Sequence, residues 1–205
     1  MELEALDADA LGEVLNIAMG HAAAALSEMA RTEVLMSIPA LEVIDAVDYL
    51  EQFAGHDEDG LLVTISKEFV GACSGEGTLI FFIEHSMNLV RGILRDEVCA
   101  EDDAGLEQEV MTEVGSILLN CCLRAIGAVL GQSFQTSLPR FARGLPAELL
   151  PACMSARDGR ALVARIDFAL RNDDVAGHLA LTLSDAALRG LLQALRARGL
   201  TIAAA

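Results

Sequence analysis

Two stretches of the chain, one hundred residues apart, have the hydrophobic periodicity of amphipathic helices. In the first, Asp9, Glu13, Asn16 and Gly20 fall within about 40° of one another on a helical wheel. The apolar residues cluster near the opposite side: Leu11, Val14, Leu15, Ala18, Ala22, Ala25, Leu26 and Met29. We therefore expect a helix with one packed face and a narrow polar stripe in solvent, here called the first stripe.

The second helical stretch has the same arrangement. Its polar stripe, the second stripe, consists of Glu109, Glu113, Ser116 and Asn120. The apolar face consists of Met111, Val114, Leu118, Cys122, Ala125, Ile126 and Val129. A second buried helix of this kind indicates that the chain contains related halves.

Matches at an offset of one hundred residues extend beyond the helices. Glu13 corresponds to Glu113 and Pro39 to Pro139. Further pairs in the same register are Val14 with Val114, Ile17 with Ile117, Ser37 with Ser137, Gly77 with Gly177 and Leu79 with Leu179. A fixed offset over most of the chain predicts two copies of one unit. We expect residues 1–205 to form one domain of two repeats, 1–100 and 101–205, related by a pseudo-twofold axis.

The rest of each unit has the pattern of a β-hairpin followed by a helix. β-branched and apolar runs predict the strands, and 3.6-residue spacing predicts the closing helices. The expected strands are residues 61–70, 78–83, 161–170 and 178–183, and the closing helices are 86–94 and 185–198. Pro39 and Pro139 each follow a short extended segment. Residues 51–60 and 96–105 are expected as a loop and an acidic junction. The pattern predicts an α+β fold with an antiparallel β-sheet core and long amphipathic helices.

Composition narrows the functional classes. The 205 residues include 31 acidic and 14 basic ones, for a net charge of −17, and 53% are hydrophobic. Such a chain can bury a core, and its charge disfavours binding to nucleic acid or to an anionic membrane surface. The five cysteines lack paired CxxC spacing, and the chain opens with acidic residues instead of a basic and apolar leader. We expect a cytoplasmic protein with reduced thiols.

Several familiar catalytic motifs are missing from the sequence. There is no GxxxxGK[ST] phosphate loop, GxSxG elbow or HExxH motif. The glycine-rich residues 71–77 lie between two expected strands, so a hairpin connection is the simpler interpretation. His21, His56, His85 and His178 lie on different elements, which argues against a metal site.

One motif carries chemistry: Asp9, three residues, Glu13, two residues, Asn16, and then 22 residues before Pro39. Asparagine is a poor helix former, so its position in mid-helix lowers the stability of the helix, and no structural reason for it is evident in the sequence. With the surrounding Glu13-Val-Leu-Asn-Ile17, this pattern resembles the CheC-like phosphatase family of bacterial chemotaxis, which includes CheC, CheX and FliY. The length and duplicated layout of the chain resemble CheC.

The second stripe departs from the family pattern. Glu113 and Pro139 match it, but Glu109 stands at the Asp or Ser position and Ser116 replaces the asparagine. Asn120 lies one turn further along, roughly 6 Å away, which is too far to substitute. We expect one working site and one vestigial or partner-binding site, formed by Glu109, Glu113 and Ser116.

The resemblance implies a hydrolase of two-component signalling that removes the phosphoryl group from a CheY-like response regulator. Asn16 would orient the attacking water, and Glu13 would pair with the regulator's lysine. Asp9 would tune contact or cap the helix, and Pro39 would be structural. No cofactor of its own is implied, because the regulator carries the Mg²⁺.

Two alternatives remain open. One is a non-catalytic adaptor that binds a phosphorylated regulator, as flagellar switch proteins do, or a CheD-type deamidase. The other is an ordinary solvated helix with no site at all. The presence of both Glu13 and Asn16 favours catalysis, because a docking helix does not need the carboxamide.

Overall fold

The computed structural model describes residues 5–45, 60–94, 104–153, 160–170 and 173–197. They form an α+β fold on a seven-stranded antiparallel sheet, so the predicted fold class is confirmed. The helices are α1 (Ala5–Ala30), α3 (Ile83–Leu94), α4 (Ala104–Leu130), α5 (Pro146–Cys153) and α6 (Asp185–Ala197). The strands are β1 (Val34–Asp45), β2 (Leu62–Val70), β3 (Ser74–Phe82), β4 (Gln135–Thr136), β5 (Arg140–Gly144), β6 (Arg160–Leu170) and β7 (Asp173–Leu183).

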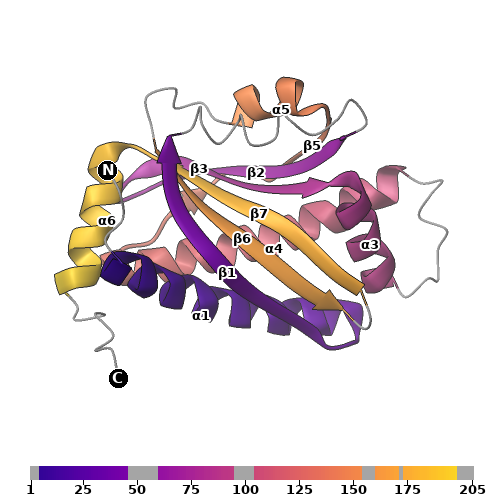
Figure 1. The fold of residues 1–205 in the computed structure, drawn as a ribbon, viewed down its shortest axis with the longest axis horizontal. Coiled ribbons are helices and arrows are strands. Elements are labelled where there is room, and N and C mark those ends of the chain that lie inside the picture. The colour runs from indigo at the N-terminus through magenta and orange to yellow at the C-terminus, as the bar shows by residue number, and fades with distance from the viewer. Residues whose placement is uncertain (1–4, 46–59, 95–103, 154–159, 171–172, 198–205) are drawn as a thin grey trace.

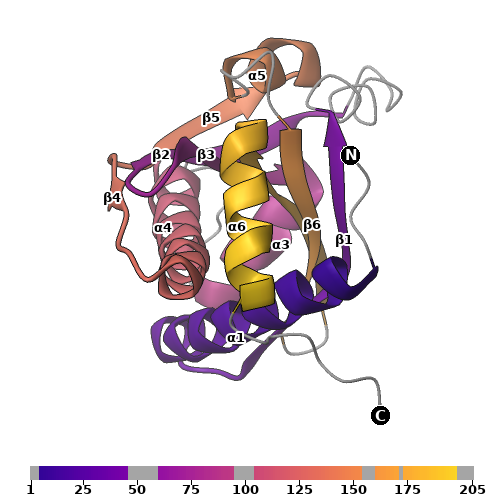
Figure 2. The same ribbon diagram turned by 90° about the vertical axis from the view of Figure 1, so that its left-hand side faces the viewer.

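The two long helices, α1 and α4, lie side by side on one face of the sheet (Figures 1 and 2). The apolar faces predicted for them are buried, with Leu11, Leu15, Val114 and Leu118 packed in a core that continues into the sheet. The short helix α5 lies on the opposite side of the sheet (Figure 1). Burial of these faces is the main source of stability, because each apolar side chain removed from water contributes about 1.5–3 kcal/mol.

The strand order has an internal symmetry. It runs β1-β6-β7-β3-β2, and β4 and β5 both pair with the outer side of β2. Exchanging each strand with the one about a hundred residues away reverses this order onto itself. In the central pair, Leu79 lies opposite Leu179, its own equivalent. The first strand of each half thus pairs with the hairpin of the other half. The division into repeats at residue 100 stays a prediction.

The element boundaries differ from those expected in several places, including α3, which begins at Ile83 instead of residue 86, and β5, which was not predicted. β3 begins at Ser74, so the glycine-rich connection is reduced to residues 71–73, and β7 begins at Asp173. β1 continues through Pro39, and α5 was not predicted. Cross-strand pairing explains the longer strands, since glycine and polar residues are extended where a neighbouring strand holds them. Most of the expected loop at 51–60 and junction at 96–105 lies outside the described residues.

Two buried carboxylates fix the beginnings of α1 and α4. Asp7 receives two hydrogen bonds from the Arg196 guanidinium, at 2.9 and 2.6 Å. At the equivalent position, Glu107 accepts from the Ser86 hydroxyl at 3.0 Å and from Arg143 at 3.1 Å. Acidic groups are favourable in the first turn of a helix, and charge-assisted hydrogen bonds also hold each carboxylate in one orientation. These anchors fix the rotation of both helices and therefore the direction of both stripes.

Helix α4 is unusually apolar. Its residues Gly105–Leu130 are long and hydrophobic enough to cross a membrane by length and composition, and 56% of the most apolar window is buried within the fold. Cys121 and Cys122 are among its buried side chains, and they are free thiols. The hydrophobicity of α4 is therefore explained by packing, since it serves as a core helix of this domain.

Candidate functional site

The first stripe projects into solvent from α1. Asp9, Glu13, Asn16 and Gly20 are all exposed, which confirms the predicted direction of this helix face. Neither the Asp9 nor the Glu13 side chain makes a hydrogen bond or ion pair with another described residue. Two carboxylates that have no partner in the described part of the chain leave this surface electrostatically available to a protein that carries positive charge.

The carboxamide of Asn16 is held by the edge strand of the sheet. The main-chain N–H of Ile38, in β1, donates to Asn16 Oδ1 at an N–O distance of 3.2 Å. The Oδ1 atom keeps a second lone pair, and both hydrogens of Nδ2 remain without a partner among the described residues. The structure thus places an oriented amide at the surface, one turn from the carboxylate of Glu13.

A groove of about 610 Å³ runs beside the first stripe, between α1 and α4. Its α1 wall contains Val14, Ile17 and His21, and its α4 wall includes Arg124 and Ala128. Ile17 follows Asn16 directly and is 53% exposed, which is unusual for a large aliphatic side chain in a core helix. The amide and the groove therefore form one continuous surface with polar and apolar parts.

The second stripe is differently arranged. Glu109 and Glu113 are exposed, but Ser116 and Asn120 are half-buried, so the expectation of a solvated stripe is wrong for these two residues. Asn120 Oδ1 accepts a hydrogen bond from the buried ammonium of Lys67 at 2.8 Å. Burial lowers the pKa of Lys67, because the charged form loses hydration. Asn120 therefore stabilises a buried cation and is not a second surface amide.

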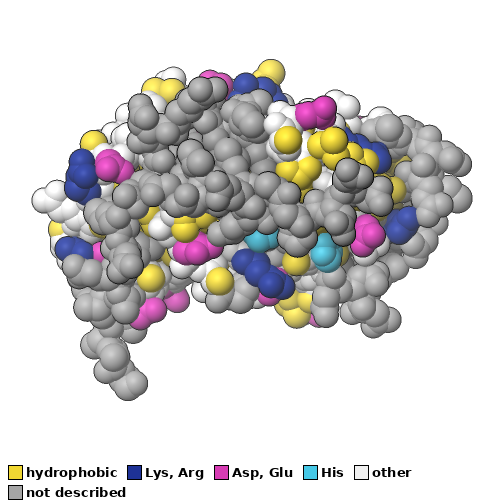
Figure 3. All heavy atoms as spheres, turned by 45° about the horizontal axis from the view of Figure 1, so that its top comes forward, with side chains coloured by type: hydrophobic (Ala, Val, Ile, Leu, Met, Phe, Trp, Pro, Cys, Tyr) yellow, Lys and Arg dark blue, Asp and Glu magenta, His cyan; other side chains and the backbone are white. Residues whose placement is uncertain are grey.

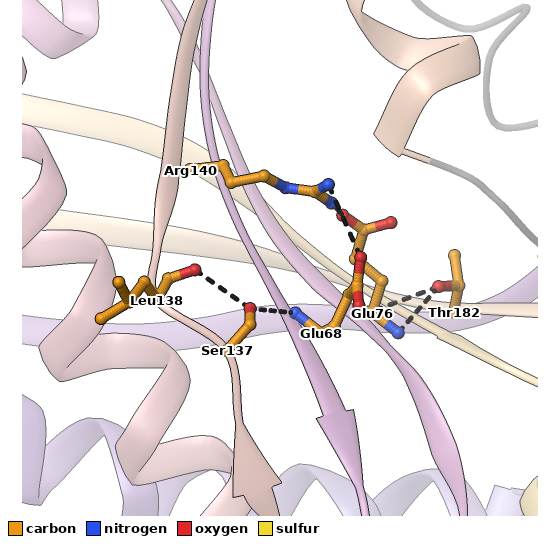
Figure 4. A network of polar contacts seen from close by, with 6 residues as sticks. All are labelled: Glu68, Glu76, Ser137, Leu138, Arg140 and Thr182. Atoms are coloured by element: carbon orange, nitrogen blue, oxygen red, sulfur yellow. Dashed lines mark hydrogen bonds and ion pairs between the residues drawn. The ribbon is translucent and has the colours of Figure 1, made fainter.

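The segment beside the second stripe is tied down by β2 (Figure 4). Ser137 and Glu68 exchange two hydrogen bonds, N–H to carbonyl and N–H to hydroxyl, each at 3.0 Å. Arg140 pairs with Glu76 at 2.6 Å and with Glu68 at 3.5 Å. Between these contacts, the side chain of Leu138 is 85% exposed. The hydroxyl of Ser116, for its part, makes no hydrogen bond with another described residue. Hence the second half lacks the contact between helix and strand that Asn16 makes.

Glu76 is the buried acid of this network. Burial raises its pKa, while hydrogen bonds from Ser66 and Arg140 act in the opposite direction. On the face shown in Figure 3, the described acidic, basic and histidine side chains are interspersed among hydrophobic ones. The described acidic side chains do not gather into one patch on that face.

No metal centre is evident in the part of the chain that the structure describes. No three His, Cys, Asp or Glu side chains there lie close enough to hold an ion. His85 instead accepts a long hydrogen bond from the Ala176 N–H, at 3.4 Å. Burial lowers the pKa of His178, and the nearby Arg165 adds to this effect. These two histidines are accounted for by local structure.

Sequence reasoning missed the main-chain donor at Ile38, the role of Lys67 and the groove between the helices. Only the spacing between Asn16 and Pro39 could have indicated the donor at Ile38, since Ile38 directly precedes the proline. Nothing in the sequence pattern pairs Lys67 with Asn120, because the two are 53 residues apart.

Comparison with known proteins finds a family match for the first motif and similar folds for the whole chain. Residues 6–43, which contain the whole first motif, match the model of the CheC-like family. The fold is similar to that of FliY from Thermotoga maritima, with 16% identity, a TM-score of 0.77, and coverage of 97% of this chain and 100% of FliY. The predicted resemblance to the CheC-like family is therefore confirmed.

Two further structures share the fold. The FliM middle domain from H. pylori has 10% identity and a TM-score of 0.64, covering 94% of this chain and 99% of that domain. CheX from Borrelia burgdorferi, crystallised in a complex with CheY, BeF3 and Mg²⁺, has 16% identity and a TM-score of 0.50, covering 82% of this chain and 96% of CheX. At such identities these likenesses establish the fold alone.

Proposed function

We propose that this protein hydrolyses the aspartyl phosphate of a CheY-like response regulator and that Asn16 positions the attacking water. The observation that carries the proposal is the exposed, oriented carboxamide of Asn16 beside the unpaired carboxylate of Glu13. Support comes from the family match over residues 6–43 and from the CheX relative that was crystallised with CheY. The site of action is the cytoplasm, where such regulators work.

The reaction needs a positioned water more than it needs covalent help. The water oxygen forms a bond to phosphorus while the bond between phosphorus and the aspartyl oxygen breaks. The products are the free carboxylate of the regulator and inorganic phosphate. Both protons of the water begin on the phosphate, which releases one of them to solvent when it forms the dianion. An amide contributes by holding the water in line, as the glutamine of small GTPases does. Orientation of this kind is worth roughly 10²-fold in rate or more.

Glu13 sets the docking register in this proposal. It lies one turn before Asn16 on the same face, so it reaches the regulator at the same time as the amide. Its negative charge is suited to the lysine beside the regulator's phosphate, and Ile17 with the groove offers apolar contact area next to it. Asp9 extends the acidic edge of the same surface.

The test is loss of acyl phosphate from a radiolabelled regulator. We expect Asn16→Ala to slow the stimulated reaction about 10²-fold while the protein stays folded, because the side chain is exposed and makes a single hydrogen bond to the strand. Ser116→Ala, at the equivalent position of the second half, is the matched control and should leave the rate unchanged. If Asn16→Ala keeps the parental rate, the assignment of Asn16 is wrong.

An adaptor is the second candidate. The FliM-like fold and the 85% exposed Leu138 beside the second stripe favour a binding role at that end of the molecule. Binding of a phosphorylated regulator without any release of phosphate would support the adaptor over the phosphatase. The docking of a CheD-type deamidase stays a prediction.

A further inference from the structure

The edge strand β1 contains an irregularity directly beneath Asn16. Ser37 pairs with Asp167 and Ala40 with Arg165, so two residues of β1 face a single residue of β6. This is the arrangement of a β-bulge, and the two residues are Ile38 and Pro39. Proline has no N–H to donate to a ladder and is tolerated at edges and bulges, so this position satisfies both conditions.

The bulge determines what the Ile38 N–H can do. It donates to Asn16 Oδ1, across 22 residues of chain, instead of to a neighbouring strand. A flipped amide would bring Nδ2 against this N–H, donor to donor, so the contact also fixes which end of the carboxamide points outward. The NH₂ group is then the end of the amide that does not contact the strand, and it is available to a docked partner.

We propose that the main-chain N–H of Ile38 is a positioning group for Asn16, set in place by the bulge at Ile38–Pro39. This inference rests on the proposed function. It explains why the motif places a proline after 22 intervening residues: a regular strand without the bulge would not present the Ile38 amide to α1 in the same way. Catalytic groups work best when neighbouring contacts have already fixed their orientation.

The second half supplies the contrast. Leu138 and Pro139 occupy the equivalent positions, but the Leu138 N–H has no hydrogen-bond partner among the described residues. Ser137 is bound to β2 instead, and the Leu138 side chain is exposed. The second half, which has Ser116 in place of the asparagine, therefore also lacks the contact between the strand and the helix.

Hydrogen exchange of the Ile38 amide tests the contact without any reference to activity. In Asn16→Ala, we expect this amide to exchange about three- to tenfold faster than in the parent, the range that one net hydrogen bond corresponds to. Asn16→Asp keeps the acceptor, so protection should persist. The Leu138 amide is the internal control and should not respond to Ser116→Ala. Unchanged exchange at Ile38 in Asn16→Ala overturns the proposal.

Kinetics test the consequence. Ile38→Pro removes the donor, and Leu138→Pro is its matched control. We expect Ile38→Pro to lower kcat about tenfold with little change in KM, because the docking surface is kept while the amide loses its orientation. Asn16→Asp should lose activity despite retained protection at Ile38, since it lacks the outward NH₂. Full activity in Asn16→Asp or in folded Ile38→Pro contradicts the inference.

Failure of the two proposals can be told apart. If the parent protein releases no phosphate, the phosphatase assignment fails, while the exchange experiment still decides whether Ile38 holds Asn16. If the parent is active and Asn16→Ala is not, but the Ile38 amide exchanges at the same rate in both, the phosphatase stands and the positioning role falls. If Ile38→Pro does not fold, the exchange measurement alone decides.

Discussion

The asparagines of α1 and α4 show how one residue type serves opposite purposes on equivalent helices. Asn16 accepts from a main-chain N–H and remains exposed, and its NH₂ group has no partner among the described residues. Asn120 is half-buried and accepts from the ammonium of Lys67, which is buried. The difference teaches that the partner of the carbonyl oxygen, more than the presence of an asparagine, decides whether a stripe can act on another protein.

The segments that follow α1 and α4 also differ: among the described residues, only the first of them forms a hydrogen bond with the polar stripe of its helix. β1 runs for twelve residues with a bulge at Ile38–Pro39, whereas the equivalent stretch is divided into β4 and β5 around Leu138. In the second half, Ser137 and Arg140 bind the strand to β2 and β3. That network stabilises the sheet edge, but no main-chain N–H in this described segment donates to the residue at position 116 of α4.

The largest effect on stability is expected from Asn120→Ala. The substitution removes the acceptor from the buried Lys67 ammonium, which costs about 1–3 kcal/mol of the free energy of unfolding. The pKa of Lys67, already lowered by burial, should fall further. Denaturant titration measures the loss. Asn16→Ala is the control, and an equal loss of stability in both variants would contradict the comparison.

Two glycines of the same helices should respond to the same substitution in opposite directions. A methyl group at Gly115 would overlap the Ile65 side chain of β2, so we expect Gly115→Ala to destabilise the fold by about 1–3 kcal/mol. At Gly12, on α1, nothing lies within 4 Å of the added carbon. There the higher helix propensity of alanine should stabilise by about 0.5–1 kcal/mol.

The same denaturant titrations compare these two variants. Opposite signs for Gly115→Ala and Gly12→Ala would show that α4 lies closer to the sheet than α1 does at these positions. Shifts of the same sign in the two variants would refute that difference.

Local periodicity predicted the parts of the fold that depend on local sequence. The buried faces of α1 and α4 were foreseen from their spacing, and so was the exposure of Glu13 and Asn16. The bulge was not, because it arises from pairing with β6, whose residues lie more than a hundred positions away. Main-chain donors such as Ile38 N–H leave no trace in a pattern of side chains. α5 is a short helix whose interior contains a second proline, Pro151, and no periodic signal marked it.

The smallest expected effect is also the most informative. Ser116→Asn completes the motif of the second half by sequence, beside Glu113 and at the right spacing from Pro139. We nevertheless expect no gain in phosphate release when this change is added to an Asn16→Ala background. Position 116 is half-buried, and no strand N–H is bonded there to fix a new amide. An unfixed carboxamide samples several rotamers, so the orientation that aids hydrolysis is rarely populated. Recovery of a substantial rate would mean that an asparagine at this point of the helix suffices by itself, and that the contact between Ile38 and Asn16 is incidental.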